Sequence, residues 1–382
     1  MSSRIRLAFW FAVRTPLVAA VAAVLVATTL ALTDGAPRSA GALGPGSNGA
    51  SLCFGQLIAT QRNADTATII DQSSNLVTRT IGVGAQPYAV TYSGDGRFAF
   101  VGEAAGRAIS MIATSSNSVV RTFSLSADVY NVIVSNHDGS VVWAQVYNGS
   151  SDNLIRVDTN TGVITIQVVT NFIRDMFLSP DEQSLWTLEY AFPNTVVGRY
   201  SAATLATVSS TIVPAHADQG AMTPDGTKIY MPNSSANNVY VFNTQTLTTT
   251  TIASTGPFNS AALSPSGTTL YTIIFDGSTH RPAILDPATQ TWSYGVDLAT
   301  IAPYTYFLGI AVTADGSKLY ISNMNYAAGG LYVVPAAAPA SATYIASEIY
   351  NQPAVCPLAT DPDPDAAPTT TPSEPVAPVF TA

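Results

Sequence analysis

Charged side chains are scarce in this sequence. Asp, Glu, Lys and Arg together make up 10% of the 382 residues, whereas globular domains usually carry about 25%. The basic residues number 15 against 24 acidic ones, which gives a formal net charge of −9. A protein that binds a phosphate backbone needs clustered positive charge, so the composition argues against nucleic acid as a partner. The hydrophobic fraction of 47% in turn argues against a disordered chain.

Histidine and cysteine, which supply many metal and redox sites, are rare as well. The sequence has three His and two Cys, and the two thiols are too far apart in sequence for a paired-cysteine metal site. It contains no HExxH motif, no P-loop and no GxSxG elbow, the motifs of zinc, nucleotide and serine-hydrolase chemistry. We therefore expect no metal and no cofactor, and the sequence identifies no catalytic residue.

The N-terminal segment has the pattern of an export signal. Basic residues come first, residues 16–32 are largely apolar, and residues 40–42 are the small Ala-Gly-Ala. This predicts a signal peptide over residues 1–42, followed by a short linker over residues 43–52. The alternative is an uncleaved membrane anchor, because the apolar run approaches the ~17–25 residues that span a bilayer. Any membrane contact would then come from this segment alone.

A tight-turn motif recurs along the rest of the chain. Its copies are 93–96 (SGDG), 136–139 (NHDG), 179–182 (SPDE), 223–226 (TPDG), 264–267 (SPSG) and 313–316 (TADG). Successive copies lie 43, 43, 44, 41 and 49 residues apart, and short apolar runs flank each copy. Asp and Gly favour tight reversals, while β-branched and aromatic residues favour strands, so each copy predicts a β-hairpin.

Two further predicted strands follow each hairpin, so that four strands recur in every unit. After the first hairpin these strands are residues 109–113 and 119–125, separated by a Ser-Asn turn. Units of this length with four strands are typical of propeller blades, whereas helical solenoids and β-helices have other periods. The sequence thus predicts an all-β fold, a β-propeller of four-stranded blades.

The repeats resemble a known family. Residues 86–101 (QPYAVTYSGDGRFAFV) are similar to the YVTN repeat of surface-layer-type propellers. The segments 228–233 (KIYMPN) and 318–323 (KLYISN) match the tyrosine-to-asparagine core of that repeat. The third copy departs from it, with Glu182 where glycine is usual and Trp186 in place of tyrosine. The resemblance implies a fold far more specifically than a function.

The two ends of the repeat region are predicted to meet. Residues 56–81 read as three strands of a first blade that lacks its innermost strand, and residues 352–356 (QPAVC) echo the start of the next innermost strand. A C-terminal innermost strand would complete a seven-bladed β-propeller over residues 53–358 and avoid unpaired edges. It would also place Cys356 beside Cys53, so we expect a disulfide, which persists in the compartments that exported proteins reach.

The C-terminal segment differs in composition from the repeats. Residues 359–382 are rich in Pro, Thr and Asp and contain few large apolar residues, so we expect a disordered tail. Its alternating Asp-Pro run could suggest calcium. Carboxylates spaced along a stiff extended chain do not converge easily on one ion, which favours a solvated spacer.

The best candidate site lies in the loops that lead into two neighbouring innermost strands. Arg174 and Asp175 come from one blade, and His216 and Asp218 come from the next. Adjacent blades would bring them together near the axis, where they could bind an anionic group or position a proton-transfer base. The alternative is a salt-bridged rim that only orders the loops. Weaker candidates in adjoining loops are Glu189, Asp276 and Arg281.

Aromatic residues also crowd the approaches to innermost strands. They could stack a sugar or an apolar ligand, or they could simply pack between blades. Of the histidines, His137 is expected in a turn on the opposite face, and His280 could face the pocket mouth. The aromatic residues concerned are Tyr88, Tyr130, Phe258, Tyr304, Tyr306 and Phe307.

Three functions are compatible with these features. The first is a secreted or cell-envelope binding scaffold whose central-pocket face holds an extracellular protein, a glycan or a small ligand, and the weak catalytic signal favours it. The second is a lactonase-like hydrolase that uses the same pocket, which only the resemblance implies, since similar propellers include lactonases. The third is a redox propeller with a quinone or metal, for which the sequence offers no convincing ligand set.

Overall fold

The computed structural model consists almost entirely of β-strands. It describes the chain at residues 53, 55–277, 279–301, 306–324, 329–346 and 353–356. The expected signal peptide, linker and tail lie outside these residues. The described part contains 28 strands and one short 3-10 helix, η1 (Leu298–Thr300). Within it, no helix has the length and apolar content needed to cross a membrane.

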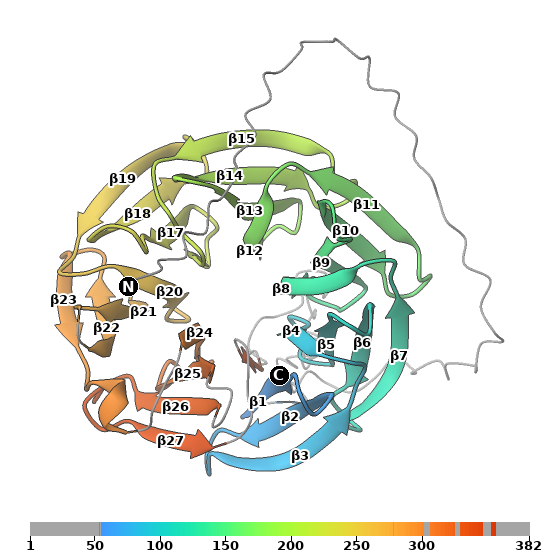
Figure 1. Ribbon diagram of the computed structural model, residues 1–382, viewed down its shortest axis with the longest axis horizontal. Helices are drawn as coiled ribbons and strands as arrows, with labels where there is room; N and C mark the ends of the chain where they lie inside the picture. The colour runs from blue at the N-terminus through green and yellow to red at the C-terminus, as the bar shows by residue number, and fades with distance from the viewer. Residues whose placement is uncertain are drawn as a thin grey trace, which may run out of the picture.

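Figure 1 shows the strands arranged as seven sheets around a central axis, and every sheet is a blade of four antiparallel strands. From the innermost strand outward, blade 1 is β28 (Ala354–Val355), β1 (Gln56–Gln61), β2 (Thr66–Asp71) and β3 (Leu76–Gly82). Blade 2 is β4 (Pro87–Tyr92), β5 (Phe98–Glu103), β6 (Ala108–Ala113) and β7 (Ser118–Ser124). Blade 3 is β8 (Asp128–Ser135), β9 (Val141–Tyr147), β10 (Asp152–Asp158) and β11 (Ile164–Val169).

The remaining blades follow the same order. Blade 4 is β12 (Phe172–Leu178), β13 (Ser184–Ala191), β14 (Asn194–Ser201) and β15 (Thr207–Val213). Blade 5 is β16 (Ala221–Met222), β17 (Lys228–Pro232), β18 (Asn238–Asn243) and β19 (Thr248–Ala253). Blade 6 is β20 (Phe258–Leu263), β21 (Leu270–Phe275), β22 (His280–Asp286) and β23 (Thr291–Tyr294). Blade 7 is β24 (Tyr306–Val312), β25 (Lys318–Met324), β26 (Gly330–Pro335) and β27 (Thr343–Ala346). The fold is a seven-bladed β-propeller, as the repeats predict.

The C-terminal strand closes the ring. In β28, Val355 pairs with Leu57 and Ala354 pairs with Ile58, so the first blade takes its innermost strand from the far end of the chain. A disulfide joins Cys53 to Cys356, with 5.7 Å between their Cα atoms. Both expectations are confirmed. Because disulfides persist in oxidising compartments, the bridge points to an extracytoplasmic location.

The hydrophobic core lies between neighbouring blades. For example, Phe100 and Ile109 of blade 2 pack against Val129 and Val142 of blade 3, and all four are fully buried. Burying side chains of this size contributes about 1.5–3 kcal/mol each. The middle strands of a blade are apolar on both faces, because a neighbouring blade covers each face. The ring is therefore held together by seven such contacts around the axis.

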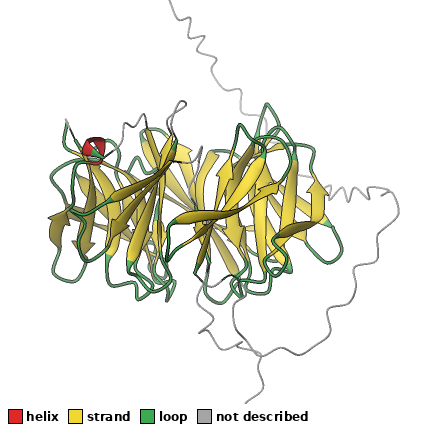
Figure 2. Ribbon diagram, turned by 90° about the horizontal axis from the view of Figure 1, so that it is seen from below, coloured by secondary structure: helices red, strands yellow, loops and turns green. Residues whose placement is uncertain are grey.

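The ring has two distinct faces, which Figure 2 shows edge-on. The turn face carries the recurrent hairpin turns that join the first and second strands of a blade. The loop face carries the loops that lead into the innermost strands, such as residues 214–220 before β16. Each innermost strand therefore runs from the loop face to the turn face.

Neighbouring hairpin turns touch one another on the turn face. Gly226 has φ +68°, and a Cβ there would lie 2.6 Å from Pro180 Cδ, so glycine is the residue that fits. The third turn has Glu182 at this position, also with a positive φ of 55°. Its Oε1 accepts a hydrogen bond of 2.6 Å from the backbone N–H of His137 in the preceding blade. Glu182 thus adds a contact between blades that glycine cannot make.

Candidate functional site

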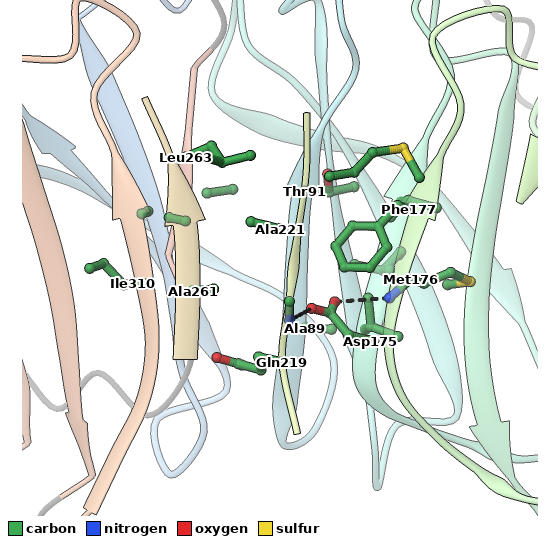
Figure 3. A pocket seen from close by; sticks show the side chains of 18 of the residues that line it. Ala89, Thr91, Asp175, Met176, Phe177, Gln219, Ala221, Ala261, Leu263 and Ile310 are labelled. Atoms are coloured by element: carbon green, nitrogen blue, oxygen red, sulfur yellow. Dashed lines mark hydrogen bonds between the residues drawn. The ribbon is translucent and has the colours of Figure 1, made fainter. Parts of the chain in front are cut away.

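A cavity of about 950 Å³ occupies the centre of the ring. All seven innermost strands contribute to its wall, and we call it the channel. Figure 3 shows part of this wall, with Asp175 and Gln219 toward one end and Phe177 and Leu263 toward the other. Ligand sites commonly measure ~300–1,000 Å³, so the channel can hold a ligand of considerable size.

A β-bulge at the start of β12 sets the position of Arg174. The pairing of β12 with β13 shifts register between Ile173 and Asp175, and an extra residue in a strand re-aims its side chain. Register also shifts at the corresponding place in β4, β8, β20 and β24. In β4 the residue at the bulge is Tyr88. The bulge is thus a feature of the repeat, and in blade 4 it carries a cation.

The Arg174 guanidinium lies at the loop-face mouth of the channel. Its central carbon is 5.0 Å from the ring centroids of Phe172 and Tyr190. Its Nε is 3.5 Å from a carboxylate oxygen of Asp218, which is too long for a hydrogen bond with good geometry. This nitrogen is buried and has no hydrogen-bond partner. The guanidinium is therefore held in place by ring contacts and one loose ion pair.

Asp175 lies deeper in the channel wall. Its carboxylate accepts hydrogen bonds from the backbone N–H of Met176 at 2.8 Å and of Gly220 at 2.9 Å (Figure 3). Because Gly220 belongs to the next blade, the second bond ties blades 4 and 5 together. Burial raises the pKa of Asp175 to about 7 despite these two bonds, since loss of water disfavours the charged form.

His216 is fixed at the same mouth by hydroxyl and ring contacts. Its Nδ1 lies 2.8 Å from Ser235 Oγ and 3.2 Å from Ser234 Oγ. Its ring centroid lies 5.5 Å from that of Tyr190 and 5.8 Å from that of Phe192. We call Tyr190, Phe192 and His216 the aromatic shelf. The shelf gives the charged cluster an apolar neighbour.

The structure brings the four predicted site residues into one region. All four line the channel, with Arg174, His216 and Asp218 at the loop-face mouth. Arg174 and Asp175 belong to β12, which corrects the prediction that they lie in the loop before this strand. Tyr190 and Phe192 were not predicted from the sequence, although the tetrapeptide Ala-Phe-Pro-Asn marks a tight loop-face turn. Phe192 is 68% exposed at the tip of that turn. In the described part of the chain, no three His, Cys, Asp or Glu side chains are grouped to hold a metal ion.

Glu189 is a buried strand residue, which corrects the prediction that it lies in a loop. It belongs to β13, and its carboxylate accepts hydrogen bonds from Thr187 Oγ1 and Tyr200 OH, both at 2.8 Å. A third bond, 3.2 Å long, comes from Asn171 Nδ2 in the loop before β12. Glu103 has the corresponding role in blade 2, where it accepts a backbone N–H from the loop before β4. These carboxylates hold the lead-in loops in place.

The other weaker candidates lie away from the channel. Arg281 and His280 belong to β22, which corrects the prediction that they lie in a loop. Arg281 Nε is 3.9 Å from the carboxylate of Asp276, which lies in the preceding connection. His280 stacks on Phe275 with 4.6 Å between ring centroids, and burial lowers its pKa. Among the residues that the structure describes, the channel wall includes none of these three candidates, Asp276, His280 and Arg281. The structure therefore separates them from the Arg174 cluster.

The predicted aromatic residues have mixed roles. Tyr88 lines the channel and packs edge-on against Tyr130, with 5.8 Å between ring centroids. Phe258 is buried with Tyr230 and Val239 of blade 5, so it packs between blades, and it stacks on Trp292 of its own blade with 5.0 Å between ring centroids. The remaining side chains of this set lie outside the described part, namely Tyr304, Tyr306 and Phe307.

Known proteins share the fold of this chain. No family model matches the sequence, and no curated protein matches it. Hydrazine synthase from Kuenenia stuttgartiensis superposes with a TM-score of 0.59 at 16% identity, over 82% of this chain and 100% of that chain. A functionally unknown protein from Desulfotomaculum acetoxidans superposes with a TM-score of 0.66 at 14% identity, over 79% of this chain and 99% of that chain. Dihydro-heme d1 dehydrogenase in complex with DHE superposes with a TM-score of 0.54 at 16% identity, over 78% of this chain and 75% of that chain. The likeness is one of fold alone.

Proposed function

We propose that the protein is a secreted or cell-envelope binding scaffold that holds an anionic group of its ligand at the loop-face mouth of the channel. The observation that carries this proposal is the set of contacts that the Arg174 guanidinium makes. The guanidinium lies over the rings of Phe172 and Tyr190, faces the channel and makes only a loose ion pair. Such a scaffold matches the predicted absence of a catalytic apparatus.

The chemistry of a guanidinium supports an anion at this position. Arginine offers five N–H donors in a planar fork that matches a carboxylate or phosphate. Nε of Arg174 is buried without a hydrogen-bond partner, so a ligand would meet the terminal N–H groups of the guanidinium, since 36% of the side chain is exposed. A ligand oxygen there would form a charge-assisted hydrogen bond, which is stronger than a neutral one. The aromatic shelf beside it would contact the apolar part of the same ligand.

Isothermal titration calorimetry with acetate, benzoate and inorganic phosphate tests this proposal. We expect at least one of these anions to bind, and Arg174→Gln to weaken that binding about tenfold or more, because a charge-assisted bond is lost. The matched control is Arg79→Gln, since Arg79 is exposed on the outermost strand β3. Absence of binding, or equal losses in the two variants, would contradict the proposal.

A lactonase-like hydrolase is the second candidate. The observation that favours it is the raised pKa of Asp175, about 7, at which a carboxylate can act as a general base near neutral pH. The resemblance of the repeats to YVTN propellers makes lactones the substrates to try. Hydrolysis of a lactone panel should exceed the spontaneous rate and disappear in Asp175→Asn and His216→Ala variants that still fold. If the wild-type protein hydrolyses none of the panel, binding is the better account.

Export is part of the proposal. It is supported by the Cys53–Cys356 disulfide and by the signal-like composition of residues 1–42. N-terminal sequencing of protein recovered from outside the cytoplasm should give a start near residue 43. A product that retains the apolar segment would instead indicate a membrane anchor.

A further inference from the structure

The wall of the channel consists largely of strand edges. Each innermost strand is hydrogen-bonded to one neighbour only, the second strand of its blade, and Figure 1 shows its other edge toward the axis. Consecutive residues line the channel along β4 and β12, at 88–92 and 174–177. Successive side chains of a strand point to opposite faces. A run without gaps therefore means that the backbone itself meets the channel.

Strand edges are surfaces for another extended chain. They present N–H and C=O groups that form ladder hydrogen bonds with a neighbouring strand. The innermost strand β12 has seven residues, which corresponds to ~23 Å at ~3.3 Å per residue. A peptide segment of about six residues matches this length. On β12 the N–H of Met176 donates to Asp175 and the C=O of Ile173 accepts from Asn131, so such a peptide would form its main-chain bonds with the remaining edge groups of the innermost strands.

The two ends of the channel differ in polarity. The loop-face mouth has Arg174 and Asp218. Toward the turn face, the wall presents the half-buried side chains of Phe177 and Met222, and Figure 3 shows Phe177 on the strand that also carries Asp175. A ligand with a negative charge at one end and apolar side chains along its length fits this arrangement.

We propose that the channel binds an extended peptide whose terminal carboxylate lies at Arg174 and whose backbone pairs with the edges of the innermost strands. This inference rests on the proposed function, because Arg174 is the anion site in both. An aliphatic acid has the same distribution of charge, but it offers no main-chain groups. It would displace water from the strand edges and leave their donors and acceptors unpaired, which is unfavourable.

The test uses an acetylated hexapeptide of alternating Thr and Val with a free C-terminal carboxylate, titrated into the full-length protein. Two control peptides have the same sequence. One has a C-terminal amide, and the other keeps the free acid but is N-methylated at alternate peptide bonds, which removes the backbone N–H donors along one edge of the peptide. We expect the free acid to bind about tenfold tighter than either control peptide. The amide loses one charge-assisted hydrogen bond, and the N-methylated acid loses several ladder hydrogen bonds. Arg174→Gln should make the acid and the amide bind equally.

A bulky side chain in the channel supplies the matched variant. Thr91 is half-buried, lines the channel and belongs to β4, so Thr91→Trp should block peptide binding. Thr78 is exposed on the outermost strand β3, and Thr78→Trp should bind as the wild type does. Circular dichroism melting curves of both variants would show that they fold.

Each contrary outcome has its own meaning. Binding of short carboxylates through Arg174 without binding of the peptide would overturn this inference and leave the proposed function intact. Failure of short carboxylates as well would remove both. Tight binding of dodecanoate that Thr91→Trp abolishes, with no binding of the hexapeptide, would make the ligand an amphipathic acid instead of a peptide.

Discussion

Arg174 and Asp175 are neighbours in sequence but lie in different surroundings. The bulge in β12 leaves Arg174 at the mouth, with 36% of its side chain exposed. Asp175 is turned into the wall, where two backbone N–H groups hold its carboxylate. One residue of the pair is therefore available to a ligand, while the other stabilises the junction of blades 4 and 5.

Replacing Asp175 by Asn is expected to change how stability depends on pH. The folded-state pKa of about 7 exceeds the ordinary value of 3.8, so the native protein holds this proton more tightly than the unfolded chain does. The stabilisation is complete below the unfolded value and is lost as the pH rises toward the folded value. Urea denaturation should show D175N gaining stability relative to wild type between about pH 5 and about pH 8.

Exposed acids provide the control for this titration. Asp286 accepts backbone hydrogen bonds in a surface turn, and these bonds lower its pKa, so Asp286→Asn should not show the same gain. If the difference in unfolding free energy between D175N and wild type is the same at about pH 5 and about pH 8, Asp175 does not titrate in this range.

The sequence located the charged part of the candidate site but not its apolar part. Arg174, His216 and Asp218 could be found because Arg174 lies near the start of an innermost strand and the other two precede the next one, and the repeat indicates where those strands begin. Tyr190 and Phe192 come from a different loop, after a second strand. Their approach to His216 depends on the angle between blades 4 and 5, which the spacing of repeats does not encode. Ligand binding by this region stays a prediction.

At the scale of the single element, the hairpin turn at Glu182 shows how a departure from the repeat is compensated. A positive φ is unfavourable for a residue with a side chain, yet the carboxylate bonds to the N–H of His137 in the preceding turn. Glu182→Ala keeps the backbone strain and removes the bond, so we expect a loss of about 1–2 kcal/mol in the free energy of unfolding. Glu182→Gly also relieves the strain, and its loss should be about 1 kcal/mol smaller.

Urea denaturation of the two variants tests this account of the turn. The ranking of the two variants is the critical result. If the glycine variant is as unstable as the alanine variant, the left-handed backbone at residue 182 costs nothing. If neither differs from wild type, the hydrogen bond to His137 contributes nothing to stability.

Strand β16 is shorter than the repeat predicts. The repeat predicts an innermost strand like the others, but only Ala221 and Met222 pair with β17. The preceding segment uses side-chain partners instead, since Thr195 Oγ1 accepts the N–H of Ala217 and Asp175 accepts that of Gly220. These partners come from blade 4, so the repeat pattern of blade 5 alone cannot reveal them.

At the scale of the whole molecule, the disulfide constrains the unfolded chain strongly. It joins residues separated by 303 positions, for which the chain-entropy model gives an upper limit of about 5–6 kcal/mol. The double variant Cys53→Ser, Cys356→Ser should therefore unfold at a markedly lower denaturant concentration than the oxidised protein.

Reduction of the wild-type protein is the control for this prediction. The reduced protein and the double variant should have the same stability, because both lack the covalent closure. Mass spectrometry of a non-reduced digest should contain the peptide that joins Cys53 to Cys356. Two free thiols in the purified, non-reduced protein, or an unchanged midpoint for the double variant, would contradict the prediction.

The number of blades and the closure of the ring could be predicted because both follow from repetition. Six hairpin turns fix six blades, and the similarity of residues 352–356 to residues 86–90 supplies the seventh. The ligand could not be predicted in the same way. Much of the channel wall is backbone, and backbone groups are identical whichever residues carry them.

The position of β28 has a consequence for biosynthesis. Chains are synthesised from the N-terminus, so the inner edge of β1 stays unpaired until all the later blades and β28 have been synthesised. A chain interrupted before residue 354 can neither cover β1 nor oxidise Cys53 with its partner. Exposed edges promote aggregation, and incompletely folded chains are degraded. Only a chain that extends through residue 356 can therefore cover β1, the first strand of the propeller, and form the disulfide.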